Sequence, residues 1–128
     1  VGPAQVIACA RRWRKMLGGG MRQSGVLAAA ALHALDHHVD RLAEDHARAA
    51  RLAKGLGRAR AIEVRACHTN MVFIDVPLAP LDALRRHLAA AGIRASIGYL
   101  PSVRLVTHLD INDDAIERSI EVFARFDA

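Results

Sequence analysis

The chain has 128 residues, of which 52% are hydrophobic and only 4% aromatic, and its formal net charge is +5. This length allows one ordinary hydrophobic core, which mainly aliphatic side chains must fill. Residues 1–23 carry five of the 18 lysine and arginine residues and no acidic residue, so the excess charge is local. A local excess favours a local anionic partner over a generally basic surface.

The cysteines and the apolar runs bear on localisation. Cys9 and Cys67 are too few for a disulfide framework, which indicates a reduced, cytoplasmic setting. No apolar run approaches the ~20 residues that span a bilayer, and the first arginines follow the first apolar stretch, unlike those of a secretory signal. We therefore predict a cytoplasmic chain with no membrane partner. The chain begins without methionine, at a helix entrance at Pro3, which is typical of a fragment.

The first predicted helix begins at Pro3 and ends at Gly18, where three consecutive glycines break the helical pattern. Cations flank the glycine run on both sides. Exposed amides, a helix start near Ser24 and these fixed cations together predict an anion site. The alternative is a flexible helix–helix connector, because the spacing matches neither the P-loop nor the dinucleotide-binding fingerprint.

One long helical region is predicted from about Ser24 to Leu56, since apolar residues recur there every three or four positions. A helix this long needs a packing partner from another domain or subunit. His46 lies on the apolar stripe and is interpreted as a partly buried packing residue rather than a catalyst. His33 and His37 stand four residues apart and could bind a transition metal. Because no third ligand is evident, an exposed pair is favoured and no metal site is predicted.

The remaining sequence predicts a small sheet with helices packed on it. The fold class is therefore α/β, with a long linking helix followed by a small two-layer α/β sandwich of about four strands. A helix that opens at Pro80 and stops at Gly92 carries an apolar inner face, and Asn112 or Asp110 caps the last helix. The predicted strands cover residues 62–66, 71–76, which is expected to be central, 93–97 and 103–107.

Three stretches together resemble a known family. They are RWRKMLGGGMRQSGVLAAA at 12–30, Asp45-His46, and PSVRLVTHLD at 101–110. They closely resemble low-specificity L-threonine aldolases, which are pyridoxal-phosphate enzymes with the aspartate-aminotransferase-like fold. The resemblance runs almost end to end, but only onto the C-terminal part of such an enzyme. It implies a large-domain tail at 1–23, a linking helix at 24–57 and a small C-terminal domain at 58–128.

The resemblance also implies a chemistry. In this family pyridoxal 5'-phosphate is held as a Schiff base on a lysine, and L-threonine or L-allo-threonine is cleaved to glycine and an aldehyde. The family's Schiff-base lysine lies shortly upstream of the stretch that matches Val1. The chain alone is therefore expected to contain no catalytic lysine and to be inactive, since neither Lys15 nor Lys54 matches that position.

Three residues carry over from the family to this sequence. Lys15 and Arg22 match positions that reach the cofactor phosphate, often from the neighbouring subunit. Arg104 matches the arginine that pairs with the substrate carboxylate; the alternative is a structural salt bridge. An arginine in an otherwise apolar strand is costly unless an anion pairs with it. The partners implied are an amino acid substrate, the remainder of the enzyme or a neighbouring subunit, and further copies in a homotetramer built from catalytic dimers.

Two other functions use the basic cluster between Arg11 and Arg22. One is a nucleic-acid-binding module, although the chain has a single tryptophan and no recognisable binding motif. The other is a non-catalytic interaction module that self-associates through the apolar stripe. The aldolase interpretation is favoured over both, and no nucleic-acid partner is predicted.

Overall fold

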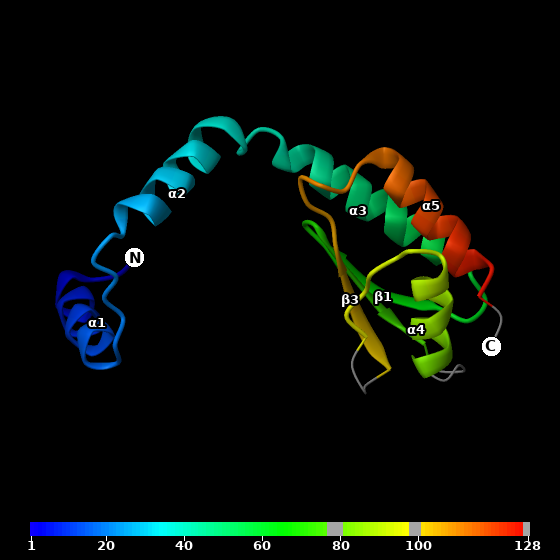
Figure 1. Cartoon of the computed structure of the whole chain (residues 1–128), viewed down its shortest axis with the longest axis horizontal. Helices are drawn as coiled ribbons and strands as arrows, with labels where there is room; N and C mark the ends of the chain where they lie inside the picture. The colour runs from blue at the N-terminus through cyan, green and yellow to red at the C-terminus, as the bar shows by residue number, and fades with distance from the viewer. Residues whose placement is uncertain (77–80, 98–100, 127–128) are drawn as a thin grey trace. The chain divides into compact units, whose positions relative to one another are not determined.

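The computed structural model describes residues 1–76, 81–97 and 101–126. Within these residues the chain forms five helices and three strands, and it divides into two compact units, Val1–Val39 and Asp40–Ala128 (Figure 1). The first unit holds α1 (Ala4–Met16) and α2 (Gly25–His37). The second holds α3 (Leu42–Leu56), β1 (Glu63–His68), β2 (Met71–Asp75), α4 (Leu81–Ala90), β3 (Ser102–Val106) and α5 (Asp113–Ala124).

Helix α1 ends as the sequence predicts. Gly18 has φ +83°, a left-handed conformation that glycine adopts without steric cost. The amide of Gly19 donates to the carbonyl of Arg14 at 2.7 Å, and that of Gly18 donates to the carbonyl of Lys15 at 3.2 Å. This pair of bonds is the Schellman arrangement, which satisfies carbonyls at a helix end. Gly18 is therefore confirmed as the stop of the first helix.

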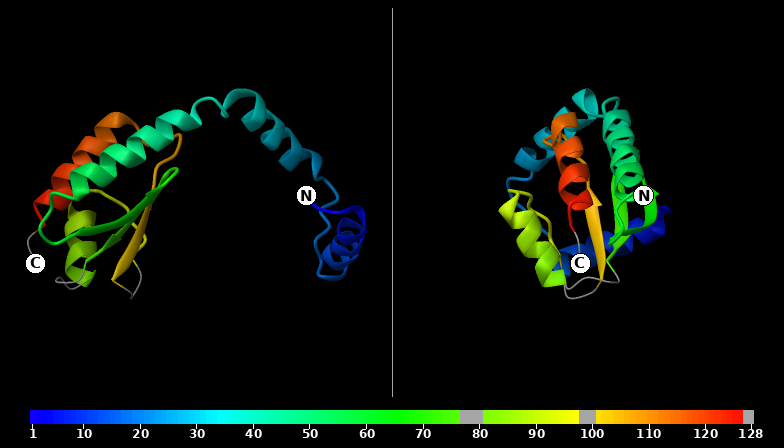
Figure 2. Two further views of the ribbon diagram at one scale, coloured as in Figure 1. Left: turned by 180° about the vertical axis from the view of Figure 1, so that it is seen from behind. Right: turned by 90° about the vertical axis from the view of Figure 1, so that its right-hand side faces the viewer.

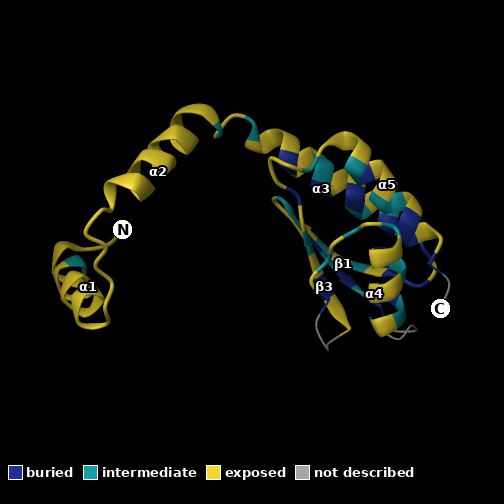
Figure 3. Ribbon diagram, viewed as in Figure 1, coloured by how far each residue is buried: buried dark blue, intermediate teal, exposed yellow. Residues whose placement is uncertain are grey.

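The first unit contains no buried residue among those described. Figure 3 shows α1 and α2 exposed along almost their whole length. Helix α2 is apolar over most of its circumference, and such helices are normally buried. The exposed large apolar side chains of this unit are Val1, Val6, Trp13, Met16, Leu17, Met21, Val26, Leu27, Leu32, Leu35 and Val39. This unit therefore has no hydrophobic core of its own.

The predicted continuous helix from Ser24 to Leu56 is wrong, because residues 38–41 form a turn between α2 and α3. His38 and Arg41, the first and last residues of this turn, both have right-handed helical dihedral angles. The three- and four-residue apolar spacing of the sequence continues across the turn and so does not reveal it. No glycine or proline marks the interruption, so the sequence carries no breaker signal there.

The sheet of the second unit is antiparallel, with strand order β1-β2-β3. Its central strand is β2, as the continuous apolar run predicted. Helices α3 and α5 lie side by side across one face of the sheet (Figures 1 and 2). Val72 and Ile74 of β2 and Val103 of β3 are buried beneath these helices, together with Phe123 of α5. The predicted two-layer α/β arrangement is therefore confirmed, with three strands in place of about four.

Helices α3 and α5 approach each other closely at Gly55. A Cβ atom built at Gly55 would lie 2.5 Å from Cδ1, 2.6 Å from Cγ1 and 2.8 Å from Cγ2 of Ile120. Real Cβ atoms do not come this close to a neighbour, so only glycine fits here without movement. Gly55 therefore sets the distance between the two helices that cover the sheet.

Helix α4 buries Leu84 and Leu88 in the same core. Its predicted start at Pro80 lies outside the described residues, as does most of the loop predicted at 98–102. Its predicted stop is confirmed, because Gly92 has φ +74° and the amide of Ile93 donates to the carbonyl of Leu88 at 2.8 Å. This is a second Schellman cap, equivalent to the one that ends α1.

The predicted strand at 93–97 is wrong. The segment does show the alternating burial expected of a strand, ending at the buried Ile97, but it pairs with no described strand. Arg85 donates to the carbonyl of Ile97 at 2.9 Å, and Arg118 donates to that of Ala91. A cavity of about 740 Å³ has residues 92–96 and residues 104–107 of the β3 region in its walls. Alternation here therefore reports one-sided burial rather than membership of the sheet.

Candidate cofactor and substrate site

The amides of the glycine run do not face outward. Those of Gly18 and Gly19 donate to carbonyls of the last turn of α1, and that of Gly20 donates to the carbonyl of Gly18 at 2.9 Å. The expectation that exposed amides of these three glycines help to form an anion site is therefore wrong. The physical reason is that the same amides are needed to cap the helix.

The cationic side chains of this loop remain available to an anion. A Cβ atom at Gly20 would lie 3.1 Å from Nζ of Lys15, so the Lys15 side chain folds back over the glycine run. Arg22 follows two residues later and is exposed. Within the described parts of the chain, neither Lys15 nor Arg22 forms an ion pair. Both side chains can therefore neutralise an anion supplied from outside this unit.

Arg104 lies on β3 and pairs in register with Phe73 of β2. Its neighbour Val103 is buried beneath the helices, so the Arg104 side chain belongs to the opposite, exposed face, as the alternation of the strand predicted. Among the residues described, no acid pairs with Arg104, which leaves the salt-bridge alternative without support. The desolvation argument also does not hold for this chain alone, because Arg104 is exposed to solvent.

The predicted site residues fall in different units. Lys15 and Arg22 belong to Val1–Val39, whereas Arg104 belongs to Asp40–Ala128. The Lys15 side chain lies on the glycine loop that leads to Arg22. Arg104 is the one charged residue of strand β3. Each half of the predicted site thus lies within its own unit.

The structure contradicts the prediction for His46. His46 is exposed, so its predicted role as a partly buried packing residue is wrong, and its neighbour Asp45 is buried instead. The rings of His33 and His37 lie 4.5 Å apart on α2. Across residues 1–76, 81–97 and 101–126 the structure contains no group of three or more His, Cys, Asp or Glu that could hold a metal ion.

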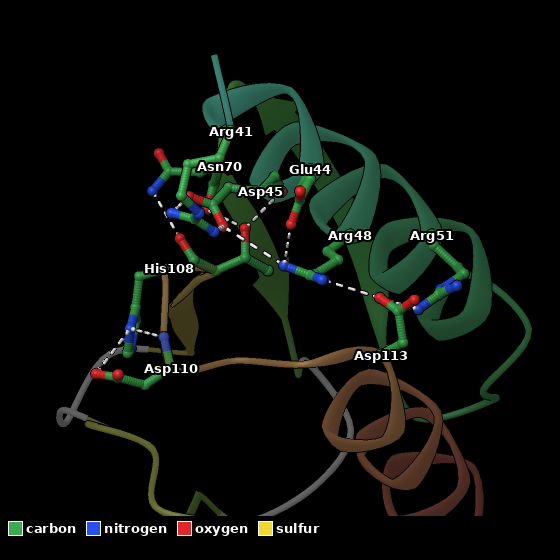
Figure 4. Close-up of polar contacts among 10 residues, drawn as sticks. Arg41, Glu44, Asp45, Arg48, Arg51, Asn70, His108, Asp110 and Asp113 are labelled. Carbon is green, nitrogen blue, oxygen red and sulfur yellow. Dashed lines mark hydrogen bonds and ion pairs between the residues drawn. The ribbon is translucent and has the colours of Figure 1, made fainter. Parts of the chain in front are cut away.

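The burial of Asp45 was not predicted. Only 3% of this residue is exposed, and its carboxylate accepts two hydrogen bonds from the guanidinium of Arg41, at 2.7 and 3.1 Å (Figure 4). Its main-chain carbonyl accepts a 2.7 Å hydrogen bond from the hydroxyl of the buried Thr107. The available signal was the charge pattern, since Arg41 precedes Asp45 by four residues and Arg48 follows it by three.

A second cluster of charges joins α3 to α5. Asp113, in the first turn of α5, accepts from Nε of Arg48 at 2.8 Å and pairs with Arg51 at 2.9 Å (Figure 4). The hydrogen bond from Arg48 lowers the pKa of Asp113, and the same bond raises the pKa of Arg48. These ion pairs link α3 to the first turn of α5, although Asp113 itself stays largely exposed.

The comparison with protein families identifies the class of the chain. Residues 1–79, more than half of the chain, match the family described as Beta-eliminating lyase. The chain therefore belongs to the beta-eliminating lyase family.

In the described residues, no helix is long and apolar enough to cross a membrane.

The curated relatives narrow the resemblance. The chain is 47% identical to the "Low specificity L-threonine aldolase" of Escherichia coli (strain K12), over 91% of this chain and 34% of that protein. It is 38% identical to the "Probable low-specificity L-threonine aldolase 2" of Arabidopsis thaliana, over 98% of this chain and 37% of that protein. The resemblance to low-specificity L-threonine aldolases is thus confirmed. The chain spans about a third of the length of these relatives.

Proposed function

We propose that this chain is the C-terminal part of a pyridoxal-phosphate-dependent aldolase that cleaves L-threonine and L-allo-threonine to glycine and an aldehyde. The observation that carries the proposal is the 47% identity to a low-specificity L-threonine aldolase over 91% of this chain. The exposed face of Arg104 and the cationic glycine loop are consistent with it. On this proposal the Schiff-base lysine lies upstream of Val1, and the chain alone is inactive.

The residues of the first unit fit the phosphate group of the cofactor. Lys15 folds over Gly20, Arg22 is exposed, and neither has an acidic partner among the described ion pairs. Charge-assisted bonds to phosphate are shorter and about twice as strong as neutral ones. The bound cofactor supplies an electron sink for the pair released when the Cα–Cβ bond of the substrate breaks. Lys15 and Arg22 would hold its phosphate and so fix where that sink lies.

Arg104 supplies the substrate contact. A planar guanidinium can donate two parallel hydrogen bonds to a carboxylate, which fixes both its position and its orientation. In the chain alone the Arg104 guanidinium is solvated, because it lies on an exposed strand face. It becomes selective for a carboxylate once the remainder of the enzyme covers this face. Holding the carboxylate orients the other substituents of Cα, including the bond to be cleaved.

The lack of a hydrophobic core in the first unit supports an oligomeric assembly. We propose that its apolar surface is covered by the remainder of the enzyme and by a neighbouring subunit, within a homotetramer built from catalytic dimers in the cytoplasm. The domain division proposed for the intact enzyme is a large-domain tail at 1–23, a linking region at 24–57 and a small domain at 58–128. The partners are then an amino acid substrate and further copies of the same enzyme.

Steady-state kinetics on the full-length enzyme test this function. Wild type should release an aldehyde from L-threonine, and Arg104→Lys should lose about 1–3 kcal/mol in kcat/KM, because lysine keeps the charge but not the fork. Thermal unfolding of both proteins controls for stability. Absence of aldehyde release from the wild type would refute the function. An Arg104→Lys variant with lower stability and unchanged kcat/KM would show that Arg104 serves structure alone.

A further inference from the structure

Two of the stretches that carry the family resemblance meet in space. Asp45 lies in the first turn of α3 and Thr107 directly follows β3, yet the hydroxyl of Thr107 donates to the carbonyl of Asp45 at 2.7 Å. Both residues are buried, with 3% and 1% of their surfaces exposed. A buried hydroxyl needs a partner, and this bond supplies one across 62 residues of sequence. The contact has no role in the function proposed above.

A third residue completes the junction. The amide of Thr107 donates to the carbonyl of Asn70 at 2.9 Å, and Nδ2 of Asn70 donates to the carbonyl of Thr107 at 2.8 Å. Asn70 lies in the turn between β1 and β2, where Thr69 has φ +50°. All the main-chain and side-chain polar groups of Thr107 are therefore hydrogen-bonded, to the β1–β2 turn on one side and to α3 on the other.

The far side of the junction is also anchored. The Asp45 carboxylate receives the guanidinium fork of Arg41, and Arg48 lies 3.9 Å away (Figure 4). The first turn of α3, including the carbonyl that Thr107 reaches, is thus held by an ion pair at its other face. Thr107 therefore connects β3 to a helix end that is braced internally by the Arg41–Asp45 ion pair.

The junction lies at the end of β3, where it bears on the register of that strand. Directly before it, Val106 pairs with Met71 and Arg104 pairs with Phe73. A shift of one residue along β2 would move every side chain of β3 to the other face of the sheet. It would place Arg104 beneath the helices and Val103 in solvent. The bonds of Thr107 to Asn70 and to Asp45 oppose that shift at the end of the strand.

We propose that Thr107 is a positioning residue for substrate binding, which acts by locking the register that presents Arg104 on the open face of the sheet. This inference rests on the proposed role of Arg104 as the carboxylate-binding residue. Thr107 itself does not touch the substrate. Asn70 is the second member of the lock and Asp45 is its anchor.

The test compares hydroxyl deletions in the full-length enzyme. Thr107→Val removes the hydroxyl with little change in shape, whereas Thr107→Ser retains the hydroxyl and removes only the methyl group. Ser119→Ala is a matched control, because the hydroxyl of Ser119 also donates to a carbonyl at 2.7 Å, but within α5. The measured quantities are KM and kcat for L-threonine and, in the reverse direction, the KM values for glycine and for the aldehyde. Arg104→Lys is measured in parallel.

We expect Thr107→Val to raise KM for L-threonine and for glycine about tenfold, with KM for the aldehyde unchanged, because only the amino acids carry the carboxylate. Thr107→Ser should restore both values to within about threefold of wild type, and Ser119→Ala should change neither. If Thr107→Val does not fold, as judged by circular dichroism, Asn70→Ala takes its place, since Asn70 is only half-buried. The same selective rise in KM is then expected.

Three results overturn the inference, and each has a different meaning. If Arg104→Lys raises KM for glycine while Thr107→Val behaves like Ser119→Ala, Thr107 does not position Arg104 and the proposed function stands. If Arg104→Lys leaves KM unchanged, the role of Arg104 fails and the positioning role fails with it. If the wild-type enzyme releases no aldehyde from threonine, the proposed function itself is wrong.

Discussion

Replacing Gly55 with alanine tests the close approach of α3 and α5. In an exposed helix interior this change stabilises by about 1 kcal/mol, because alanine has the higher helix propensity. At Gly55 the new methyl group would meet three atoms of Ile120 at 2.5–2.8 Å. Isoleucine is stiff at χ1 in a helix, so its Cγ atoms cannot turn away freely. Overpacking of this kind costs about 1–3 kcal/mol, so we expect a net loss of up to about 2 kcal/mol.

Thermal unfolding followed by circular dichroism measures the loss. For a unit of this size 1 kcal/mol corresponds to about 4–8 °C, so Tm should fall by up to roughly 16 °C. Gly25→Ala is the matched control, because Gly25 begins α2 and a Cβ atom there has no neighbour within 4 Å. Adding Ile120→Ala should relieve the clash, so the double variant should lose less than the sum of the single variants. A Tm for Gly55→Ala at or above that of wild type would refute the packing argument.

Three further predictions concern charge and the cofactor. Arg22→Ala in the full-length enzyme should weaken cofactor retention about ten- to a hundredfold, because a charge-assisted bond contributes about 1.5–3 kcal/mol; an unchanged dissociation constant, measured by equilibrium dialysis, would count against the role. The lowered pKa of Asp113 means that its bond to Arg48 stabilises the fold above the unfolded-state pKa of about 3.9 and is lost as pH falls through the lower folded-state value. Urea unfolding should therefore show wild type losing more stability than Asp113→Asn between about pH 6 and pH 2, and equal losses would contradict this. Pyridoxal phosphate followed by borohydride should give no stoichiometric, site-specific label at Lys15 or Lys54 of the 128-residue chain; peptide mapping checks this, and such a label accompanied by aldolase activity would disprove it.

The sequence predicted the helix ends, because a single residue with a special conformation or side chain decides the geometry there. Gly18 and Gly92 mark helix ends because a left-handed residue is needed there, and both have positive φ. Asn112 was one of two candidate caps for the last helix, and its side chain accepts from the amide of Ala115 at 2.9 Å. The continuous apolar run of β2 predicts the central strand, and β2 does pair with both β1 and β3.

The signals failed where distant contacts decide. The apolar spacing of the sequence continues across the turn at 38–41, so periodicity could not reveal it. Residues 93–97 alternate like a strand, but the guanidinium groups of Arg85 and Arg118 bind carbonyls at the two ends of this region. On α3 the apolar stripe is predicted to include His46, but the buried residue is its neighbour Asp45, about 100° away around the helix.

The predicted site shows the same division. The face of Arg104 followed from strand alternation, which needs no knowledge of other elements. For the glycine loop, the sequence analysis predicts both a helix stop at Gly18 and exposed amides that bind an anion. These two predictions exclude each other, because amides that cap α1 cannot also point at an anion. The helix-stop signal at Gly18 already contained this result, since a Schellman cap uses the amides of both Gly18 and Gly19. The junction between Asp45, Asn70 and Thr107 depends on tertiary contacts that no local pattern contains.

The position of β3 has a consequence for solubility. Among the described residues β3 pairs only with β2, so its outer side is a sheet edge with unpaired main-chain groups. Such edges can pair with a strand of another molecule and start aggregation, and a charged side chain in mid-strand is a common way to prevent this. Arg104 stands at the middle of β3, between Val103 and Leu105, and we expect it to oppose such pairing. A neutral residue at 104 should therefore lower the concentration at which the protein precipitates, whether or not any substrate is present.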